Sequence, residues 1–99
     1  MFVLELTYTA PLARVEEHQD AHAAWLDALY GEGLLIASGR KNPRDGGVLL
    51  AAGVDRDGAE RIAASDPYSE AGVCAYRITE FIATRTAPAL EEYREQPSA

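Results

Sequence analysis

The first segment of the chain alternates between apolar and polar side chains. Residues 2–9 read FVLELTYT, and one face of an extended chain would carry Phe2, Leu4, Leu6 and Tyr8. A period of two residues is typical of a strand with one buried face. Pro11 is expected to end this strand region, because proline cannot donate a ladder hydrogen bond.

The next segment has a helical period instead. Apolar positions recur at intervals of seven, four and three residues, as expected for one face of a helix over residues 15–30. The members of this stripe are Val15, His22, Leu26 and Leu29. Gly31 and Gly33 follow, and glycine commonly ends a helix because it tolerates positive φ. The predicted buried face therefore includes one imidazole, a group that titrates near neutral pH.

Two short apolar runs come next, at residues 34–38 and 48–54. The Gly, Pro, Asn and Asp residues between them predict a loop over residues 39–47. Two adjacent strands joined by a loop are the simplest interpretation.

A second, shorter helix is predicted to begin at an aspartate N-cap and to run to Ser65. Pro67 interrupts it, and Asp66 is well placed to cap one further turn over residues 68–72. Residues 73–84 alternate again and predict a long last strand.

The order strand, helix, strand, strand, helix, strand predicts an α+β, ferredoxin-like split βαβ fold, in which two helices cover one face of a four-stranded antiparallel sheet. One domain is expected over residues 1–85. For residues 86–99, a short surface helix and a frayed tail both remain open. The uncovered sheet face and the long last strand favour a homodimer in which two sheets face each other as a dimeric α+β barrel.

Composition narrows the class of protein. The net charge of −7 disfavours nucleic acid and anionic membranes as partners. The start lacks the pattern of a secretory signal, no apolar run is long enough to span a membrane, and Cys74 has no second cysteine, so the expected compartment is the cytoplasm. Basic residues cluster once, at Arg40, Lys41 and Arg44, in a stretch large enough to meet one small anion.

Four stretches resemble the YciI-like (YCII-related) proteins of the dimeric α+β barrel superfamily. They are HAAWLDALYGEGLL, IASGR, DGGVLLAAG and DGAERIAASDPYSEAGV, and the resemblance runs over residues 2–83. It implies an active site in which the helix histidine and the aspartate of the Asp-Pro-aromatic motif form a dyad, here His22 and Asp66. Family members often have an arginine where this chain has Gln19 and a proline where it has Arg40, and these departures concern the substrate more than the fold.

A carboxylate beside an imidazole makes a competent general acid and base. The alternative stays open that His22 is a core histidine bonded to a backbone carbonyl and that Asp66 only caps a helix. His18, one turn before His22, is read as a surface residue and not as a metal ligand. Cys74 is read as buried and inert.

Further residues are candidate ligand contacts. Ser38 ends a strand, Tyr68 and Trp25 offer aromatic walls, and Arg40 with Lys41 would guide a small, anionic molecule from a loop over the pocket mouth. No cofactor motif and no metal site are expected. The favoured function is a cofactor-independent isomerase or lyase, dehydrochlorinase-like, that uses the His22–Asp66 dyad. The alternative is a non-catalytic module that binds a small metabolite or serves in assembly.

Overall fold

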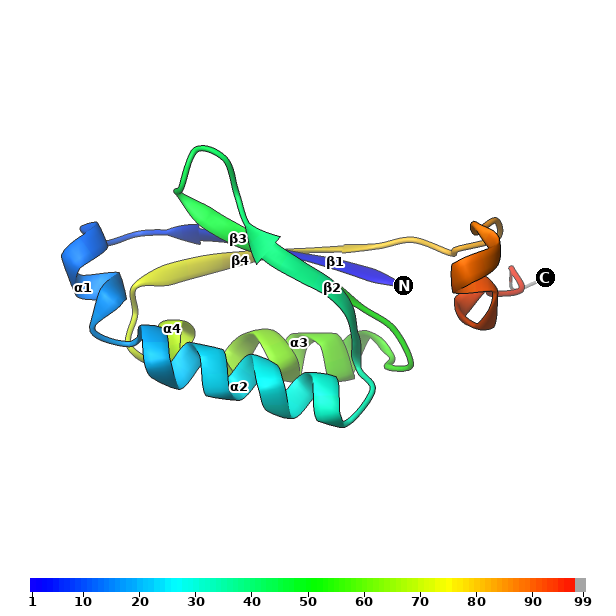
Figure 1. The fold of residues 1–99 in the computed structure, drawn as a ribbon, viewed down its shortest axis with the longest axis horizontal. Coiled ribbons are helices and arrows are strands. Elements are labelled where there is room, and N and C mark those ends of the chain that lie inside the picture. The colour runs from blue at the N-terminus through cyan, green and yellow to red at the C-terminus, as the bar shows by residue number, and fades with distance from the viewer. Residues whose placement is uncertain (98–99) are drawn as a thin grey trace.

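A computed structural model of the chain, which describes residues 1–97, has a four-stranded antiparallel sheet with helices on one face (Figure 1). The strands are β1 (Phe2–Tyr8), β2 (Leu35–Arg40), β3 (Gly46–Ala51) and β4 (Cys74–Glu80), in the spatial order β2-β3-β1-β4. The helices are α1 (Leu12–Glu16), α2 (Gln19–Gly31), α3 (Arg56–Ser65), α4 (Pro67–Glu70) and the 3₁₀ helix η1 (Pro88–Tyr93). The predicted ferredoxin-like fold is confirmed. None of the helices within residues 1–97 is long and apolar enough to cross a membrane.

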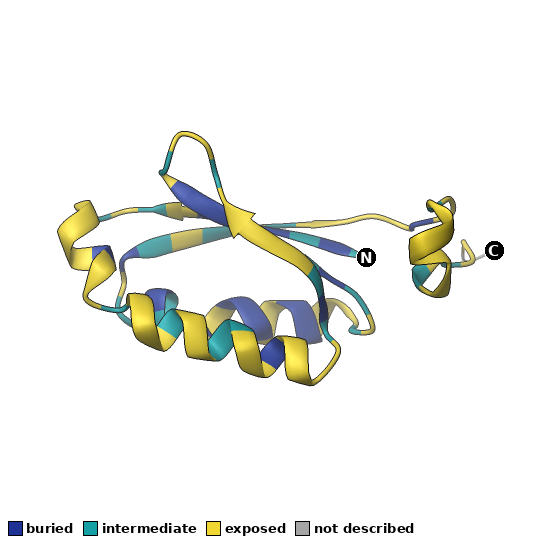
Figure 2. Cartoon of the chain, viewed as in Figure 1, coloured by how far each residue is buried: buried dark blue, intermediate teal, exposed yellow. Residues whose placement is uncertain are grey.

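The core lies between the sheet and the helical layer (Figure 2). The alternation predicted for β1 is confirmed, because Phe2, Leu4 and Leu6 are at most 2% exposed. Leu4 pairs with Leu49 on β3 and with Ile78 on β4, so the apolar side chains of three strands meet on one face. Helix α3 contributes small residues that allow close packing, and α2 contributes its buried Leu29.

The predicted helix over residues 15–30 is two helices. Helix α1 ends at Glu16, and His18 leaves helical geometry with φ −113° and ψ 9° before α2 begins at Gln19. The break places α1 at the end of the sheet at an angle to α2 (Figure 1). Val15 is wholly buried there, whereas the other residues of the predicted stripe belong to α2.

Helix α2 ends as its glycines predict. The amide of Leu34 donates to the carbonyl of Leu29, that of Gly33 donates to Tyr30, and Gly33 has φ 75°. This is the Schellman arrangement, which satisfies carbonyls that a helix end leaves free.

The strands of the β2–β3 hairpin reach further into the predicted loop than expected. Strand β2 continues to Arg40 and β3 begins at Gly46, and the two strands pair up to Arg40 and Gly47. Gly46 lies so close to the Leu6 carbonyl that a Cβ atom there would clash with it. Glycine at this position therefore serves close strand packing. At its other end β3 stops at Ala51, before the predicted Val54.

The last strand is shorter than predicted. Strand β4 ends at Glu80, and the chain then leaves the sheet and leads to η1, which lies apart from the helical layer (Figure 1). Glu95 ties this C-terminal segment to the first residue, because its Oε1 atom lies 2.6 Å from the Met1 ammonium. Residues 98–99 of the predicted tail lie outside the described residues.

The face of the sheet that carries no helix is partly apolar. Val3 pairs with Leu50 and Glu5 with Val48. These pairs alternate along the strands with the buried Leu4–Leu49 pair, so their side chains point to the opposite face. Val3, Val48 and Leu50 are all half-buried in the single chain.

Candidate active site

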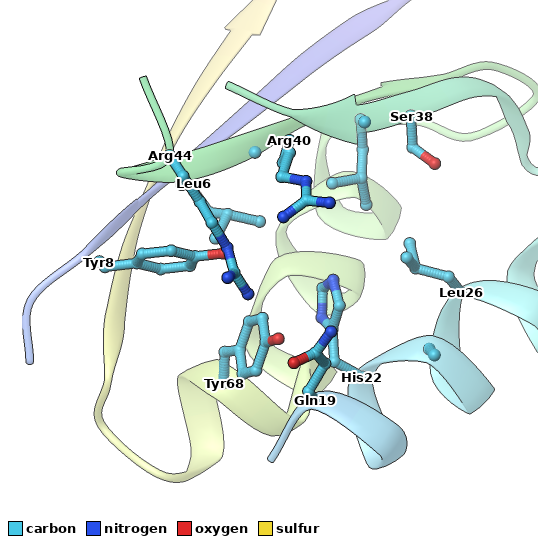
Figure 3. Close-up of a pocket in the computed structure, with 14 residues that line it drawn as sticks. Leu6, Tyr8, Gln19, His22, Leu26, Ser38, Arg40, Arg44 and Tyr68 are labelled. Carbon is cyan, nitrogen blue, oxygen red and sulfur yellow. The ribbon is translucent and has the colours of Figure 1, made fainter. Parts of the chain in front are cut away.

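A cavity of about 200 Å³ lies between the sheet and α2, beneath the β2–β3 hairpin. Side chains from β1, α2, the hairpin and α4 line it, and Figure 3 shows those of the sheet side facing those of the helical side. Residues far apart in the sequence, such as Tyr8, His22 and Tyr68, meet at this cavity.

His22 and Asp66 lie at the helical side of the cavity. His22 Nδ1 is 2.8 Å from Asp66 Oδ1. Asp66 is fully buried, whereas the His22 side chain is 15% exposed and lines the cavity. Because a carboxylate only accepts hydrogen bonds, this contact places the proton of the neutral imidazole on Nδ1 and leaves Nε2 free for a ligand.

The local sequence explains how Asp66 is positioned. Pro67 forbids continuation of α3 and starts α4, so Asp66 adopts an extended conformation with φ −61° and ψ 127°. Its Oδ1 atom accepts a hydrogen bond of 2.9 Å from the Tyr68 amide and so caps α4. The capping role and the contact with His22 are therefore both present in one side chain.

A third donor reaches Asp66 from the sheet. The hydroxyl of Tyr76 on β4 donates to Asp66 Oδ2 over 2.5 Å. Burial and this hydrogen bond to Asp66 both raise the pKa of Tyr76, so the phenol stays protonated and remains a donor. With His22, the Tyr68 amide and Tyr76 around it, both oxygens of the buried carboxylate are satisfied.

Tyr68 forms an aromatic wall beside the imidazole. Its ring stacks on the His22 ring with centroids 4.1 Å apart and planes 10° apart. Burial, with Tyr8 and Asp66 nearby, raises the pKa of Tyr68 to about 12. The hydroxyl is therefore a neutral hydrogen-bond donor at physiological pH.

Trp25, chosen from the sequence as a wall of the pocket, is not among the cavity-lining residues. It lies beside His22, with ring centroids 5.5 Å apart, and its Nε1 donates to Ser65 Oγ over 3.0 Å. Trp25 therefore packs beside the His22 imidazole from outside the cavity.

Ser38 and Arg40 both line the cavity. In β2 they pair with Leu49 and Gly47, which sets both side chains on the helix-covered face. Ser38 Oγ is 2.7 Å from the hydroxyl of Tyr30.

Lys41 does not lie at the cavity, contrary to the expectation for the basic loop. It follows Arg40 directly, so it points to the opposite face, where its Nζ is 3.3 Å from Glu5 Oε2 and 3.6 Å from Asp45 Oδ1. Arg44 takes its expected place and points into the cavity (Figure 3).

Sequence reasoning did not single out Tyr76, Tyr8 or Gln19 for the site. Tyr8 and Tyr76 both fall on the apolar face of their predicted strands. The alternation predicts which face of the sheet each ring occupies, but it does not predict the residues that the ring contacts. Gln19 departs from the family pattern, and it lines the cavity one turn before His22.

Cys74 is half-buried near Ser69, with Sγ 3.7 Å from Ser69 Oγ. Burial raises the pKa of the thiol, so the reactive thiolate is disfavoured at neutral pH.

The chain belongs to the YCII-related domain family, whose sequence profile matches residues 1–82. A similar solved structure is 5-chloro-2-hydroxyhydroquinone dehydrochlorinase (TftG) from Burkholderia phenoliruptrix AC1100, in complex with 2,5-dihydroxybenzoquinone. The match has a TM-score of 0.65 and 19% sequence identity, and it covers 82% of this chain and 93% of the other. At this identity the match supports the fold. No curated protein matches the chain significantly.

Proposed function

We propose that this protein is a small-molecule enzyme of the proton-transfer type, a lyase or an isomerase, in which His22 is the acid–base group and Asp66 orients it. The observation that carries the proposal is the 2.8 Å contact between His22 Nδ1 and the wholly buried Asp66 carboxylate, at the wall of a cavity. The contact keeps the lone pair of Nε2 available to remove a proton from a ligand and stabilises the imidazolium that results.

In an elimination, His22 Nε2 would take a proton from a C–H or O–H group of the substrate. The electron pair of that bond would form a new double bond, and the leaving group would depart with the pair of its own bond. The substrate loses only the elements of an acid, so the step is balanced without an oxidant or a reductant. In an isomerisation, His22 would return the proton to a different atom of the same molecule.

The structural neighbour supports the lyase form of the proposal, because dehydrochlorination is an elimination. We propose Ser38, Arg40 and Tyr68 as ligand contacts, since all three line the cavity that His22 faces. A tyrosine that stays protonated can donate to a substrate oxygen while its ring stacks beside the imidazole.

We propose a homodimer formed through the uncovered face of the sheet. Val3, Val48 and Leu50 form a half-buried apolar strip on that face, and face-to-face packing of two sheets would bury it. The cytoplasm remains the proposed compartment, because Cys74 is the single cysteine of the sequence and has no partner for a disulfide within it.

Halide release from a halogenated hydroxyhydroquinone tests the reaction. We expect turnover by the wild-type protein and a decrease in kcat of about 10²- to 10⁴-fold for His22→Ala, the usual contribution of a general acid–base group. Arg56→Gln is the control, because Arg56 is exposed and pairs with Glu60 and Glu80 away from the cavity. Full turnover by His22→Ala would reject His22 as the base. Binding without turnover would favour the non-catalytic module.

A further inference from the structure

Two arginines reach into the cavity from the sheet side. Arg40 ends β2, and Arg44 lies in the connection to β3. Figure 3 shows both side chains directed from the hairpin towards His22 and Tyr68, which rise from the helical layer. A ligand in the cavity would therefore lie between two guanidinium groups and the imidazole.

The charges of these arginines are poorly compensated by the protein. Arg44 Nε is buried and has no hydrogen-bond partner within residues 1–97, and its ion pair with Glu16 spans 3.7 Å. Arg40 is exposed in the single chain, and no carboxylate is among the described residues that line the cavity. A buried donor without an acceptor costs free energy, which a bound acceptor would recover.

Lys41, in the same hairpin, has its charge compensated by nearby carboxylates. Its ammonium group lies near Glu5 and Asp45 on the opposite face of the sheet. Of the three clustered basic residues, Lys41 lies outside the cavity beside two carboxylates, whereas Arg40 and Arg44 line the cavity. In a protein with a net charge of −7, this arrangement concentrates positive potential at one small site.

The sheet side of the cavity is apolar and has little side-chain bulk. Leu6 and Leu49 provide apolar surface, and Gly46 and Gly47 expose backbone without side chains. The volume of about 200 Å³ is below the roughly 300–1,000 Å³ of pockets that take drug-sized ligands. A single substituted ring is the size of molecule that this space suits.

We infer that the cavity binds a planar organic anion of about one ring, whose carboxylate, enolate or phenolate oxygen meets Arg40 and Arg44 while the ring lies against Tyr68 and His22. A guanidinium group can hold the two oxygens of a carboxylate with two parallel hydrogen bonds. The inference rests on the proposed function for the fate of the anion, whereas the preference for an anion over a neutral molecule depends on the two arginines.

Isothermal titration at neutral pH with salicylate and its neutral isostere salicylamide tests the inference. We expect salicylate to bind the wild-type protein at least 10-fold more tightly than salicylamide does, and salt to weaken salicylate binding. Arg44→Gln and Arg40→Gln should each weaken salicylate binding at least 10-fold. Lys41→Gln, which removes the same charge from the same hairpin, should change it less than 2-fold.

One further variant and a second readout separate the possible causes of a loss of binding. Arg44→Lys retains the charge without the fork, and its binding should fall between wild type and Arg44→Gln, which also guards against misfolding of the glutamine variant. Halide release tests the base through His22→Ala, whereas salicylate binding to the arginine variants, in which His22 is intact, tests the anion site, so a failed base assignment is distinguishable from a failed anion site. Equal affinity for the two probes, no salicylate binding at millimolar concentration, or a larger effect of Lys41→Gln than of Arg44→Gln would overturn the inference.

Discussion

The hydroxyl of Tyr76 donates a hydrogen bond of 2.5 Å to Asp66 Oδ2 from the sheet, while His22 meets the other oxygen from α2. The buried carboxylate is thus fixed from two layers of the fold. Its orientation towards His22 depends on β4 as well as on the turn that contains it.

Replacing Tyr76 by Phe removes one donor to a buried carboxylate and keeps the ring. We expect the free energy of unfolding to fall by about 1.5–3 kcal/mol, the range for hydrogen bonds to charged groups. Urea denaturation measures this change. Tyr30→Phe is the matched control, because it removes an exposed hydroxyl bonded to Ser38 and should cost less than about 1 kcal/mol. Equal losses in the two variants would contradict the role assigned to Tyr76.

Alkaline pH should destabilise the protein through its buried tyrosines. The pKa of Tyr68 rises from 10.0 in the unfolded chain to about 12 in the folded protein, mainly because burial disfavours the phenolate. Above pH 10 the unfolded chain therefore binds fewer protons at this site than the folded protein, and stability falls as pH rises from 10 to about 12. Urea midpoints across this range should fall less steeply for Tyr68→Phe. Parallel curves for the two proteins would show that Tyr68 is not responsible.

The proposed sheet-to-sheet dimer predicts a specific monomeric variant. Leu50 is half-buried on the uncovered face and pairs with Val3. Leu50→Asp would place a charge in the centre of the buried interface, and we expect it to sediment near the 10.7 kDa of one chain. Wild type should sediment near twice that mass at micromolar concentration. Its circular dichroism should match that of the variant. A wild-type protein that sediments only as one chain would contradict the dimer.

Local sequence patterns were sufficient to predict several parts of this fold. The alternation in residues 2–9 identified the buried face of β1, and the Asp66-Pro67 pair indicated the end of α3 and the cap of α4. These features depend on neighbours in the sequence, so a single sequence can reveal them. The break between α1 and α2 contains neither glycine nor proline, and no local pattern announced it.

Other features depend on strand register, which the sequence did not supply. Tyr76 pairs with Leu6 on β1, and this pairing sets its ring on the face where Asp66 lies. Arg40 faces the cavity and Lys41 faces away because β2 continues to Arg40, whereas the sequence placed the end of the strand at Ser38. A strand end shifted by two residues was enough to misplace Lys41.

The tautomer of His22 tests the central claim most directly. Correlation of the ring ¹⁵N and ¹H signals by NMR distinguishes a proton on Nδ1 from one on Nε2. We predict that neutral His22 carries its proton on Nδ1, facing Asp66, and that Asp66→Asn shifts the proton towards Nε2, because an amide can donate to Nδ1 where a carboxylate cannot. A wild-type His22 that carries its proton on Nε2, unchanged in Asp66→Asn, would contradict the dyad.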